Sequence, residues 1–166
     1  MTEMTIEQLV QQHGNTVYRL AYAQTRSRHD ADDIFQEVFL RVAQHRPVFD
    51  SDEHAKAWLL RVTLNCLKSH WRAAWRRHDV PLDERIPFPA PEERTLADAL
   101  QQLTPKYRVT VHLHYYEGYS TEEIARMTAE KPSTIRTRLT RARAKLRDLL
   151  KGEFDDELRA DLSQHE

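Results

Sequence analysis

Glycine is almost absent from this chain, and that shortage limits the folds it can adopt. Among 166 residues the only glycines are Gly14, Gly118 and Gly152. Phosphate-binding loops and folds with many tight hairpins depend on glycine, because glycine adopts positive φ angles without steric cost. We therefore expect neither, and the apolar residues recur at helical spacing, which favours an all-α fold class.

The apolar spacing predicts two groups of helices. The expected helices span residues 5–25, 30–45, 55–77, 94–103, 105–116, 121–128 and 132–150. Asp30 is expected to cap the second helix, and either Ser133 or Thr134 the last. Ser120 and Glu123 have the spacing of a capping box, which predicts a helix start at residue 121.

Prolines divide the chain into two parts. Four of the seven prolines lie within residues 79–93. Proline lacks a backbone donor and biases the preceding residue against helix, so this stretch is expected to be a linker. We predict two small helical domains, 1–78 and 94–151, joined by this Pro-rich linker and followed by an acidic tail at 152–166.

Neither membrane insertion nor disulfide bonding is indicated. No run approaches the roughly 20 apolar residues of a spanning helix, and the N-terminus does not resemble a signal peptide. Cys66 is the single cysteine, which excludes a disulfide within the chain and a Cys-based zinc site. Its position on an apolar stripe predicts a buried side chain. We expect a cytoplasmic protein.

The formal net charge of −1 conceals a strong segregation of charge. Residues 58–77 include five basic side chains and no acid, and residues 131–151 include eight basic side chains and one acid. The acids are concentrated in residues 79–100 and in the tail. Blocks of opposite sign in a nearly neutral chain predict separate surfaces for separate partners.

The segment 121–147 has the pattern of a helix-turn-helix. A short helix with the small residue Ala125 precedes a tight turn and a longer helix, in which Ile135 and Leu139 are expected to pack against the short one. In this motif the second helix enters the DNA major groove. Its basic residues are expected on the remaining faces, where they contact guanine edges and phosphates: Arg136, Arg138, Arg141, Arg143, Lys145 and Arg147.

Three segments, in the correct order, resemble bacterial RNA polymerase sigma factors of the extracytoplasmic-function group. The family's polymerase-binding helix is similar to DADDIFQEVFLRVAQH, and its promoter-melting helix to AWLLRVTLNCLKSHWRAAWRR. Its C-terminal DNA-binding region is similar to GYSTEEIARMTAEKPSTIRTRLTRARAKLRDLL. The resemblance covers about residues 10–150. It implies a transcription initiation factor that binds core RNA polymerase and promoter DNA, aids strand opening, and is held inactive by an anti-sigma protein.

Matching positions assign three sets of site residues. The resemblance implies that polymerase is bound by Asp33, Gln36 and Glu37. It implies that the non-template strand of the minus-ten element is captured by Phe49, Asn65, Lys68 and Arg72. It implies that the minus-thirty-five element is recognised by Arg136, Thr137, Thr140 and Arg141. Trp71 and Trp75 are either core residues or stacking platforms for bases.

Three positions depart from the family's pattern. Ala129 stands where the family has a turn glycine, so the turn is expected to form without a residue that adopts positive φ freely. Glu130 replaces an apolar turn residue and puts an acid close to the DNA-facing helix. Ser69 replaces an acid that is frequent after the family's asparagine. The first two departures affect the register of the helix-turn-helix.

Catalysis and metal binding find no support in the sequence. His112 and His114 form a His-x-His pair, but a spacing of two on a helix points them to different faces, and we expect no metal or other cofactor. No Ser/His/Asp or paired-carboxylate arrangement stands out, so no enzymatic activity is expected. Two alternatives remain: a stand-alone helix-turn-helix transcriptional regulator, and an enzyme or RNA-processing protein that uses the basic Trp-rich helix.

Overall fold

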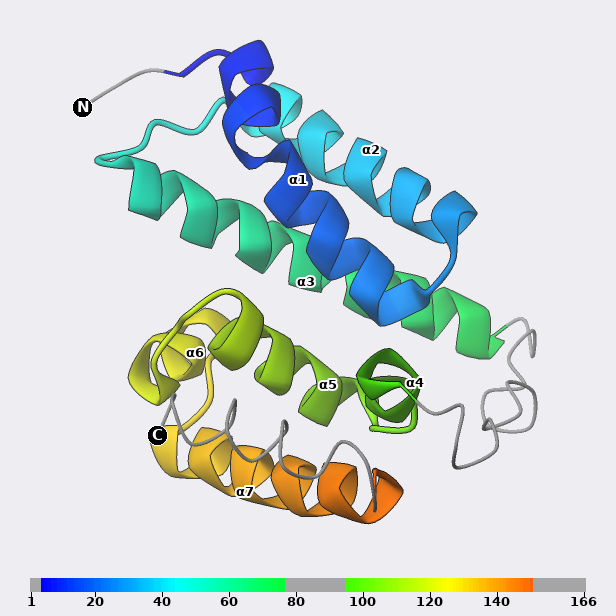
Figure 1. Cartoon of the computed structure of the whole chain (residues 1–166). Helices are drawn as coiled ribbons and strands as arrows, with labels where there is room; N and C mark the ends of the chain where they lie inside the picture. Colours follow the sequence, from blue (N-terminus) through cyan, green and yellow to red (C-terminus); the bar gives the residue numbers. More distant parts are fainter. Residues whose placement is uncertain (1–3, 77–94, 151–166) are drawn as a thin grey trace. The chain divides into compact units, whose positions relative to one another are not determined.

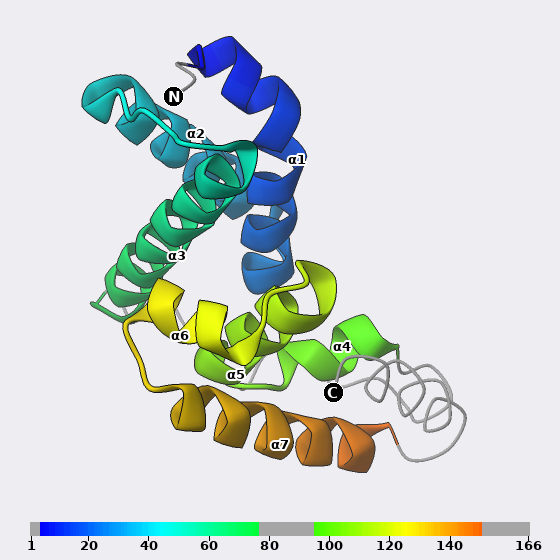
Figure 2. The same ribbon diagram turned by 90° about the vertical axis from the view of Figure 1, so that its left-hand side faces the viewer.

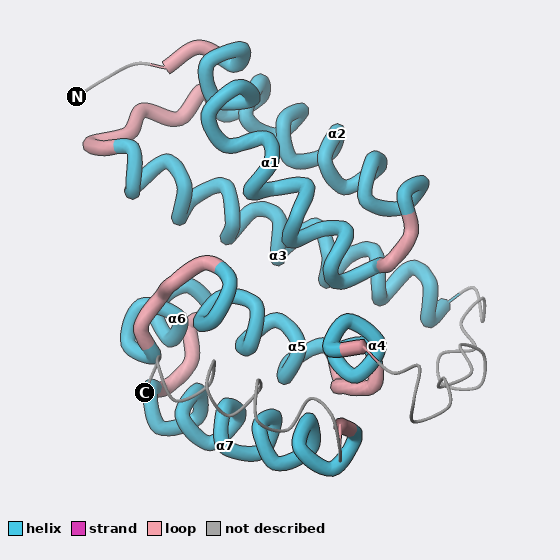
Figure 3. The backbone as a smooth tube through the Cα atoms, in the orientation of Figure 1, coloured by secondary structure: helices cyan, strands magenta, loops and turns pink. Residues whose placement is uncertain are grey.

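The chain forms two compact units, Met1–Asp83 and Glu84–Glu166. The computed structural model describes residues 4–76 and 95–150 (Figure 1). Within those ranges there are helices and loops but no strand (Figure 3), which confirms the all-α prediction. The predicted linker 79–93 and tail 152–166 lie outside the described residues. None of the described helices combines the length and apolar character that crossing a membrane requires.

Over residues 4–76 the first unit is a bundle of three helices, α1 (Ile6–Thr25), α2 (Arg28–His45) and α3 (Asp52–Arg76). Each helix packs against the other two, around a shared core (Figures 1 and 2). The core is built from apolar side chains at helical spacing, among them Leu9, Val17, Leu20, Ile34, Val38, Leu59, Leu60 and Leu67. Because these residues are buried, the other faces of α2 and α3 are exposed to solvent. The site residues predicted on these two helices lie on those faces.

Serines begin α2 and α3, and both helices start earlier than predicted. The N-cap of α2 is Ser27, whose Oγ accepts a hydrogen bond of 3.1 Å from the Asp30 backbone N–H. The prediction of Asp30 as the cap is therefore wrong. Similarly, Ser51 Oγ accepts from the backbone N–H of His54 at 3.1 Å. Each serine satisfies an N–H that has no partner within its helix.

In the described part of the second unit, residues 95–150, there are five short to medium helical elements. They are α4 (Leu96–Gln101), α5 (Pro105–Val111), the π-helical turn η2 (His112–Tyr116), α6 (Thr121–Thr128) and α7 (Pro132–Leu149). The expected single helix over residues 105–116 thus changes to a wider π turn for its last five residues. The expected helix over 94–103 is shorter at both ends. Buried side chains of α5, α6 and α7 form the core, including Val109, Ile124, Ile135, Leu139 and Leu146.

Both α6 and α7 begin at the predicted residues, but only the predicted cap of α6 is correct. Ser120 Oγ accepts from the Glu123 N–H at 3.1 Å, and the Glu123 carboxylate accepts from the Ser120 N–H at 3.2 Å. This reciprocal pair is the predicted capping box. In contrast, α7 has Lys131 at its N-cap without a side-chain cap. Pro132 begins the helix instead of Ser133 or Thr134 serving as the cap, because its fixed φ suits the first helical position.

Candidate functional site

One face of α2 presents polar and acidic side chains to solvent. Asp33, Gln36 and Glu37 are all exposed, and their spacing of three and four residues brings them to the same side of the helix. Leu40, one turn further on, is 53% exposed and extends this face with an apolar side chain. Glu37 Oε1 accepts a hydrogen bond of 3.3 Å from Arg41 Nε but remains half exposed. We call Asp33, Gln36, Glu37 and Leu40 the α2 face.

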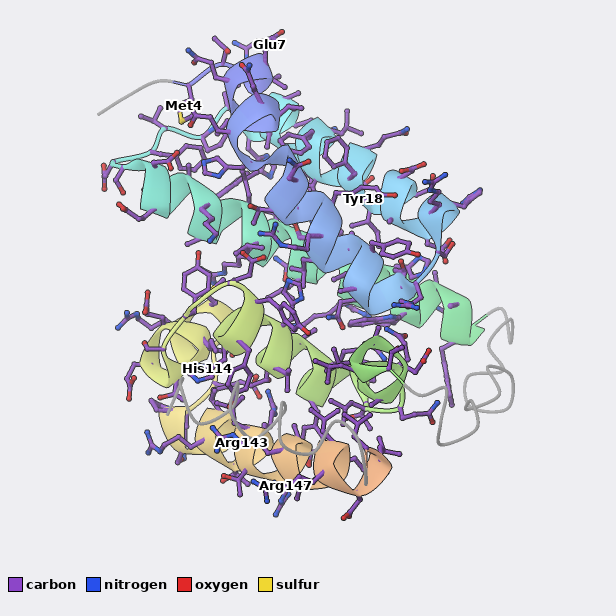
Figure 4. The ribbon with its side chains drawn as sticks, viewed as in Figure 1. Met4, Glu7, Tyr18, His114, Arg143 and Arg147 are labelled. Atoms are coloured by element: carbon purple, nitrogen blue, oxygen red, sulfur yellow. The ribbon has the colours of Figure 1, made fainter. Side chains whose placement is uncertain are left out.

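A shallow depression lies beside the α2 face, between α1 and α2. Its volume is about 420 Å³, and Gln36 and Tyr18 are among its lining residues. Figure 4 labels Tyr18 on α1. Gly14 lies in the same depression, and a Cβ at that position would stand 3.5 Å from the ring of Phe35, which is ordinary contact. The α2 face is therefore continuous with a concave surface that offers both aromatic and polar groups.

One face of α3 is basic from Arg61 to the end of the helix. Its exposed residues recur every three or four positions, with no acid among them: Arg61, Asn65, Lys68, Arg72 and Arg76. Leu60, Leu64 and Leu67 on the other side of the helix are buried. Trp75 is 69% exposed at the C-terminal end of this α3 face, while Trp71 is partly covered. Of the two tryptophans, Trp75 has the greater surface for stacking.

The sequence groups Phe49 with Asn65, Lys68 and Arg72, but its side chain does not lie on their exposed surface. Its side chain is 2% exposed. Its ring centroid lies 5.6 Å from that of Trp58 and 5.3 Å from that of His54, both in edge-on geometry. The ring therefore belongs to the core of the first unit. The expectation that Phe49 lies on the same surface as Asn65 is corrected: it supports the loop before α3 from the inside.

The turn between α6 and α7 is closed by a residue in the left-handed region. Ala129 has φ 57° and ψ 43°. The following N–H, that of Glu130, donates to the Ala125 carbonyl at 2.9 Å. This is the geometry that glycine usually provides at a helix C-terminus. The turn thus reaches this geometry without a residue that adopts positive φ freely, because Ala129 adopts it in spite of its Cβ.

We expect Ala129→Gly to raise the free energy of unfolding of the second unit by about 0.5–1 kcal/mol. Relief of the left-handed strain is worth roughly 1–2 kcal/mol, and the greater entropy of glycine in the unfolded chain offsets part of it. Chemical denaturation of the full chain, followed by helical circular dichroism, measures the change. A matched Ala144→Gly variant, at an exposed position inside α7, should instead lose about 1 kcal/mol.

The outer face of α7 carries four exposed residues assigned to base recognition. Arg136, Thr137, Thr140 and Arg141 lie on it, opposite the buried Leu139. Each threonine hydroxyl donates to the carbonyl four residues earlier, at 2.9 Å and 3.0 Å, so its oxygen remains available as an acceptor. The Arg136 guanidinium lies 3.7 Å from the Glu122 carboxylate on α6. In contrast, Arg141 has no ion-pair partner among the described residues.

Two residues of α5 adjoin the α7 face, and the sequence did not identify them. Lys106 and Tyr107 line a shallow pocket of about 360 Å³ together with Thr137 and Arg141. The lysine is exposed and the tyrosine is partly covered. Nothing in the local sequence of α5 indicates this role, because packing of α5 against α7 brings the two helices together.

Two of the six basic residues of α7 are paired with side chains of their own unit. Arg138 forms a two-pronged ion pair with Glu130, and its side chain is only 12% exposed. Arg143, labelled in Figure 4, donates from Nε to the Tyr115 hydroxyl at 2.7 Å, and its guanidinium lies over the same ring. The expectation that all six face outward is therefore wrong for these two. The acid near the DNA-facing helix, Glu130, is neutralised by its partner.

The Glu130 pair is expected to make stability depend on pH. The hydrogen bonds from Arg138 hold the pKa of Glu130 below its ordinary value of 4.5. A lowered folded-state pKa stabilises the protein above the unfolded-state value, and this stabilisation is lost as the pH falls through and below it. We expect Glu130→Gln to lose about 1–2 kcal/mol at pH 7 in denaturant unfolding. The difference from the unsubstituted chain should shrink below pH 4.5; a constant difference would contradict the charge-based account.

The two histidines singled out in the sequence have polar neighbours in the fold, and the single cysteine is buried. His112 is buried, with its Nε2 atom 3.3 Å from Glu117 Oε1, and His114 Nδ1 lies 2.7 Å from the Tyr119 carbonyl oxygen. The two histidines therefore have different surroundings. Cys66 is buried as predicted, and burial raises the pKa of its thiol to about 11. At neutral pH this thiol is protonated and behaves as a small apolar side chain.

Comparisons with known proteins match both units. The family model "Sigma-70 region 2" matches residues 9–77, and "Sigma-70, region 4" matches residues 93–146. The ECF RNA polymerase sigma factor SigE of Mycolicibacterium smegmatis is 38% identical over 157 residues, which are 87% of this chain and 61% of that protein. SigM of Mycobacterium tuberculosis is 32% identical over 149 residues, which are 87% of this chain and 76% of that protein.

A solved structure has the same fold. The sigma factor RpoE of Bartonella quintana, in complex with the anti-sigma factor NepR, aligns with a TM-score of 0.73 at 23% identity. The alignment covers 89% of this chain and 97% of that one. At this identity the likeness is evidence for the fold alone. This chain spans less than two thirds of the length of the M. smegmatis relative.

Proposed function

This chain belongs to the extracytoplasmic-function group of RNA polymerase sigma factors, and from that membership we propose that it is a promoter-specific transcription initiation factor. One observation carries the proposal: two units present separate exposed faces, an acidic one on α2 and basic ones on α3 and α7. A regulator that acts on duplex DNA alone needs only the second unit. In this proposal the polymerase catalyses RNA synthesis, and this chain positions the polymerase at the promoter.

Polymerase binds at the α2 face in this proposal. Asp33 and Glu37 offer carboxylate oxygens and Gln36 an amide, which suit basic and polar groups on a partner helix. Leu40, exposed one turn away, supplies apolar contact at the same face. Such charge complementarity raises the association rate and excludes wrong partners more than it adds to affinity.

The α3 face captures the unpaired strand of the minus-ten element. Asn65 is exposed between basic side chains, so its amide can hydrogen-bond to the edge of a base while Lys68 and Arg72 neutralise the neighbouring phosphates. Trp75 provides a ring on which a base stacks. Phe49 contributes from beneath by fixing the loop that precedes α3.

The α7 face reads the minus-thirty-five element in the major groove. Arg136 and Arg141 supply guanidinium groups for guanine edges, and Thr137 and Thr140 supply acceptor oxygens and methyl groups. Lys106 contacts phosphate beside them. Because a sigma factor that is always active would misdirect polymerase, we further infer an inhibitory anti-sigma protein that covers these faces. The B. quintana sigma factor RpoE was solved in complex with a protein of that kind, the anti-sigma factor NepR.

A charge reversal at the α2 face tests the proposal. We expect Glu37→Lys to weaken binding to core RNA polymerase by at least about tenfold, because a like charge replaces an attractive one in the interface. Glu53→Lys is the matched control, since Glu53 is an exposed acid in the first turn of α3. Affinity is measured by fluorescence anisotropy of the labelled chain, and promoter-dependent run-off transcription is measured in parallel. Equal effects of the two reversals would contradict a specific docking face.

A further inference from the structure

Two carboxylates and an imidazole converge at the first turn of α2. His29 Nδ1 lies 3.3 Å from Asp33 Oδ2 and 3.7 Å from Asp30 Oδ1. One ligand atom from each of the three residues can be chosen so that all lie within 4.8 Å of one another. His29 and Asp33 are exposed, so the cluster is open to solvent on one side. The sequence analysis did not identify this group, whose three residues are neither a His-x-His pair nor a cysteine motif.

These separations match the distances between ligands of a tetrahedral metal ion. Zinc binds histidine nitrogen and carboxylate oxygen at roughly 2.0–2.2 Å, which places neighbouring ligand atoms roughly 3.3–3.6 Å apart. The two measured separations, 3.3 and 3.7 Å, lie within or close to that interval. Two of the three separations between ligand atoms therefore fit a tetrahedral ion, and the third lies within 4.8 Å.

A second helix holds one of the carboxylates in place. His70 of α3 has its Nε2 atom 3.5 Å from Asp30 Oδ2, while Asp30 Oδ1 faces His29. The His70 side chain is 24% exposed, so packing restricts its position. In protein metal sites a carboxylate ligand is commonly held in position by an outer-shell residue that contacts it. His70 has that position relative to Asp30. The cluster thus depends on the contact of α2 with α3, and not only on spacing along one helix.

We propose that His29, Asp30 and Asp33 bind one divalent transition-metal ion, with water completing its coordination and His70 positioning Asp30. The imidazole favours zinc, nickel or copper over magnesium or calcium, which prefer oxygen ligands alone. With a neutral imidazole the three ligands carry a charge of about −2, which a divalent cation balances. Because Asp33 also belongs to the α2 face, a bound ion would compete with polymerase for that carboxylate; this consequence, unlike the site, rests on the proposed function.

Titration of the metal-free full chain with Zn²⁺ and Co²⁺ at neutral pH tests the site. We expect one equivalent to bind with micromolar affinity in calorimetry, and bound Co²⁺ to show the intense visible absorption of a tetrahedral site. His29→Ala and Asp33→Asn should each weaken binding at least tenfold, and His70→Ala by about tenfold as an outer-shell change. His45→Ala is the matched control, because His45 is an exposed histidine in the last turn of the same helix and should have no effect.

Two results would overturn the site. One is uptake that does not saturate near one equivalent, and the other is unchanged affinity in both His29→Ala and Asp33→Asn. Absence of metal uptake at neutral pH also overturns it. Polymerase binding is measured with a chelator present, so that no metal is bound. A loss of binding under this condition concerns the α2 face as a docking surface and not the metal site.

Discussion

Arg141→Ala is expected to lower transcription from the cognate promoter by roughly 5- to 150-fold while leaving the affinity for core polymerase unchanged. Arg141 is exposed on the α7 face and has no ion-pair partner among the described residues, so its guanidinium is available to DNA. A bidentate contact with guanine contributes about 1–3 kcal/mol of discrimination, which corresponds to that range. Run-off transcription and polymerase binding, measured on the same preparations, give the two readouts.

A second arginine on α7 is the control for this prediction. Arg147 is exposed and follows Arg141 by six residues, which turns it to another side of the helix. We expect Arg147→Ala to weaken binding to all duplexes by the same small factor, without changing preference among promoters. Loss of polymerase binding in Arg141→Ala would contradict the separation of the two surfaces, and an unchanged promoter preference would contradict its role in base recognition.

Phe49→Ala is expected to destabilise the first unit by about 3–5 kcal/mol. Its ring is buried against Trp58 and His54, so truncation removes apolar contact and leaves a cavity. The three tryptophans of the chain, Trp58, Trp71 and Trp75, all lie in α3. Tryptophan fluorescence during denaturant unfolding therefore reports the first unit selectively in the full chain, and it measures the change directly.

A conservative variant separates a structural role of Phe49 from a direct role in DNA binding. Phe49→Leu keeps much of the buried apolar volume and should lose far less stability, on the order of 1–1.5 kcal/mol. It should also retain promoter opening at temperatures where its first unit is folded. If Phe49→Ala left stability unchanged but abolished opening, the ring would act on the DNA strand, and its buried position would be the wrong description of the working protein.

Local patterns in the sequence predicted the helices, but the cap of α2 and the π turn at η2 could not be predicted from them. Apolar spacing located every long helix to within three residues at each end, and the Ser120–Glu123 capping box was correct because its partners are three residues apart. The cap of α2 was wrong because Ser27 and Asp30 are both good capping residues, and only the folded backbone decides between them. The π turn at η2 likewise has no local signal that distinguishes it from ordinary helix.

The exposed positions of the site followed from helical spacing, but the pairing of its charges did not. Asp33, Asn65 and Arg141 lie on outward faces because buried residues determine which side of each helix is covered. Arg138 and Arg143 were taken for surface residues, since their partners Glu130 and Tyr115 lie 8 and 28 residues away in the chain. The approach of His70 to Asp30 likewise requires the packing of two helices.

Because Arg138 and Arg143 bind residues of their own unit, we expect DNA binding by this chain to depend less on salt concentration than six exposed cations would imply. Each phosphate that a protein neutralises on duplex DNA releases counterions and contributes about −0.9 to the slope of log K against log salt concentration. Six outward cations on α7 would contribute a slope of roughly −5.4, whereas Arg136, Arg141, Lys145 and Arg147 contribute at most roughly −3.6. A tenfold rise in salt then weakens the α7 contribution by about 4,000-fold instead of about 250,000-fold. Less of the affinity is nonspecific attraction to phosphate, and a larger share depends on the sequence of the bases.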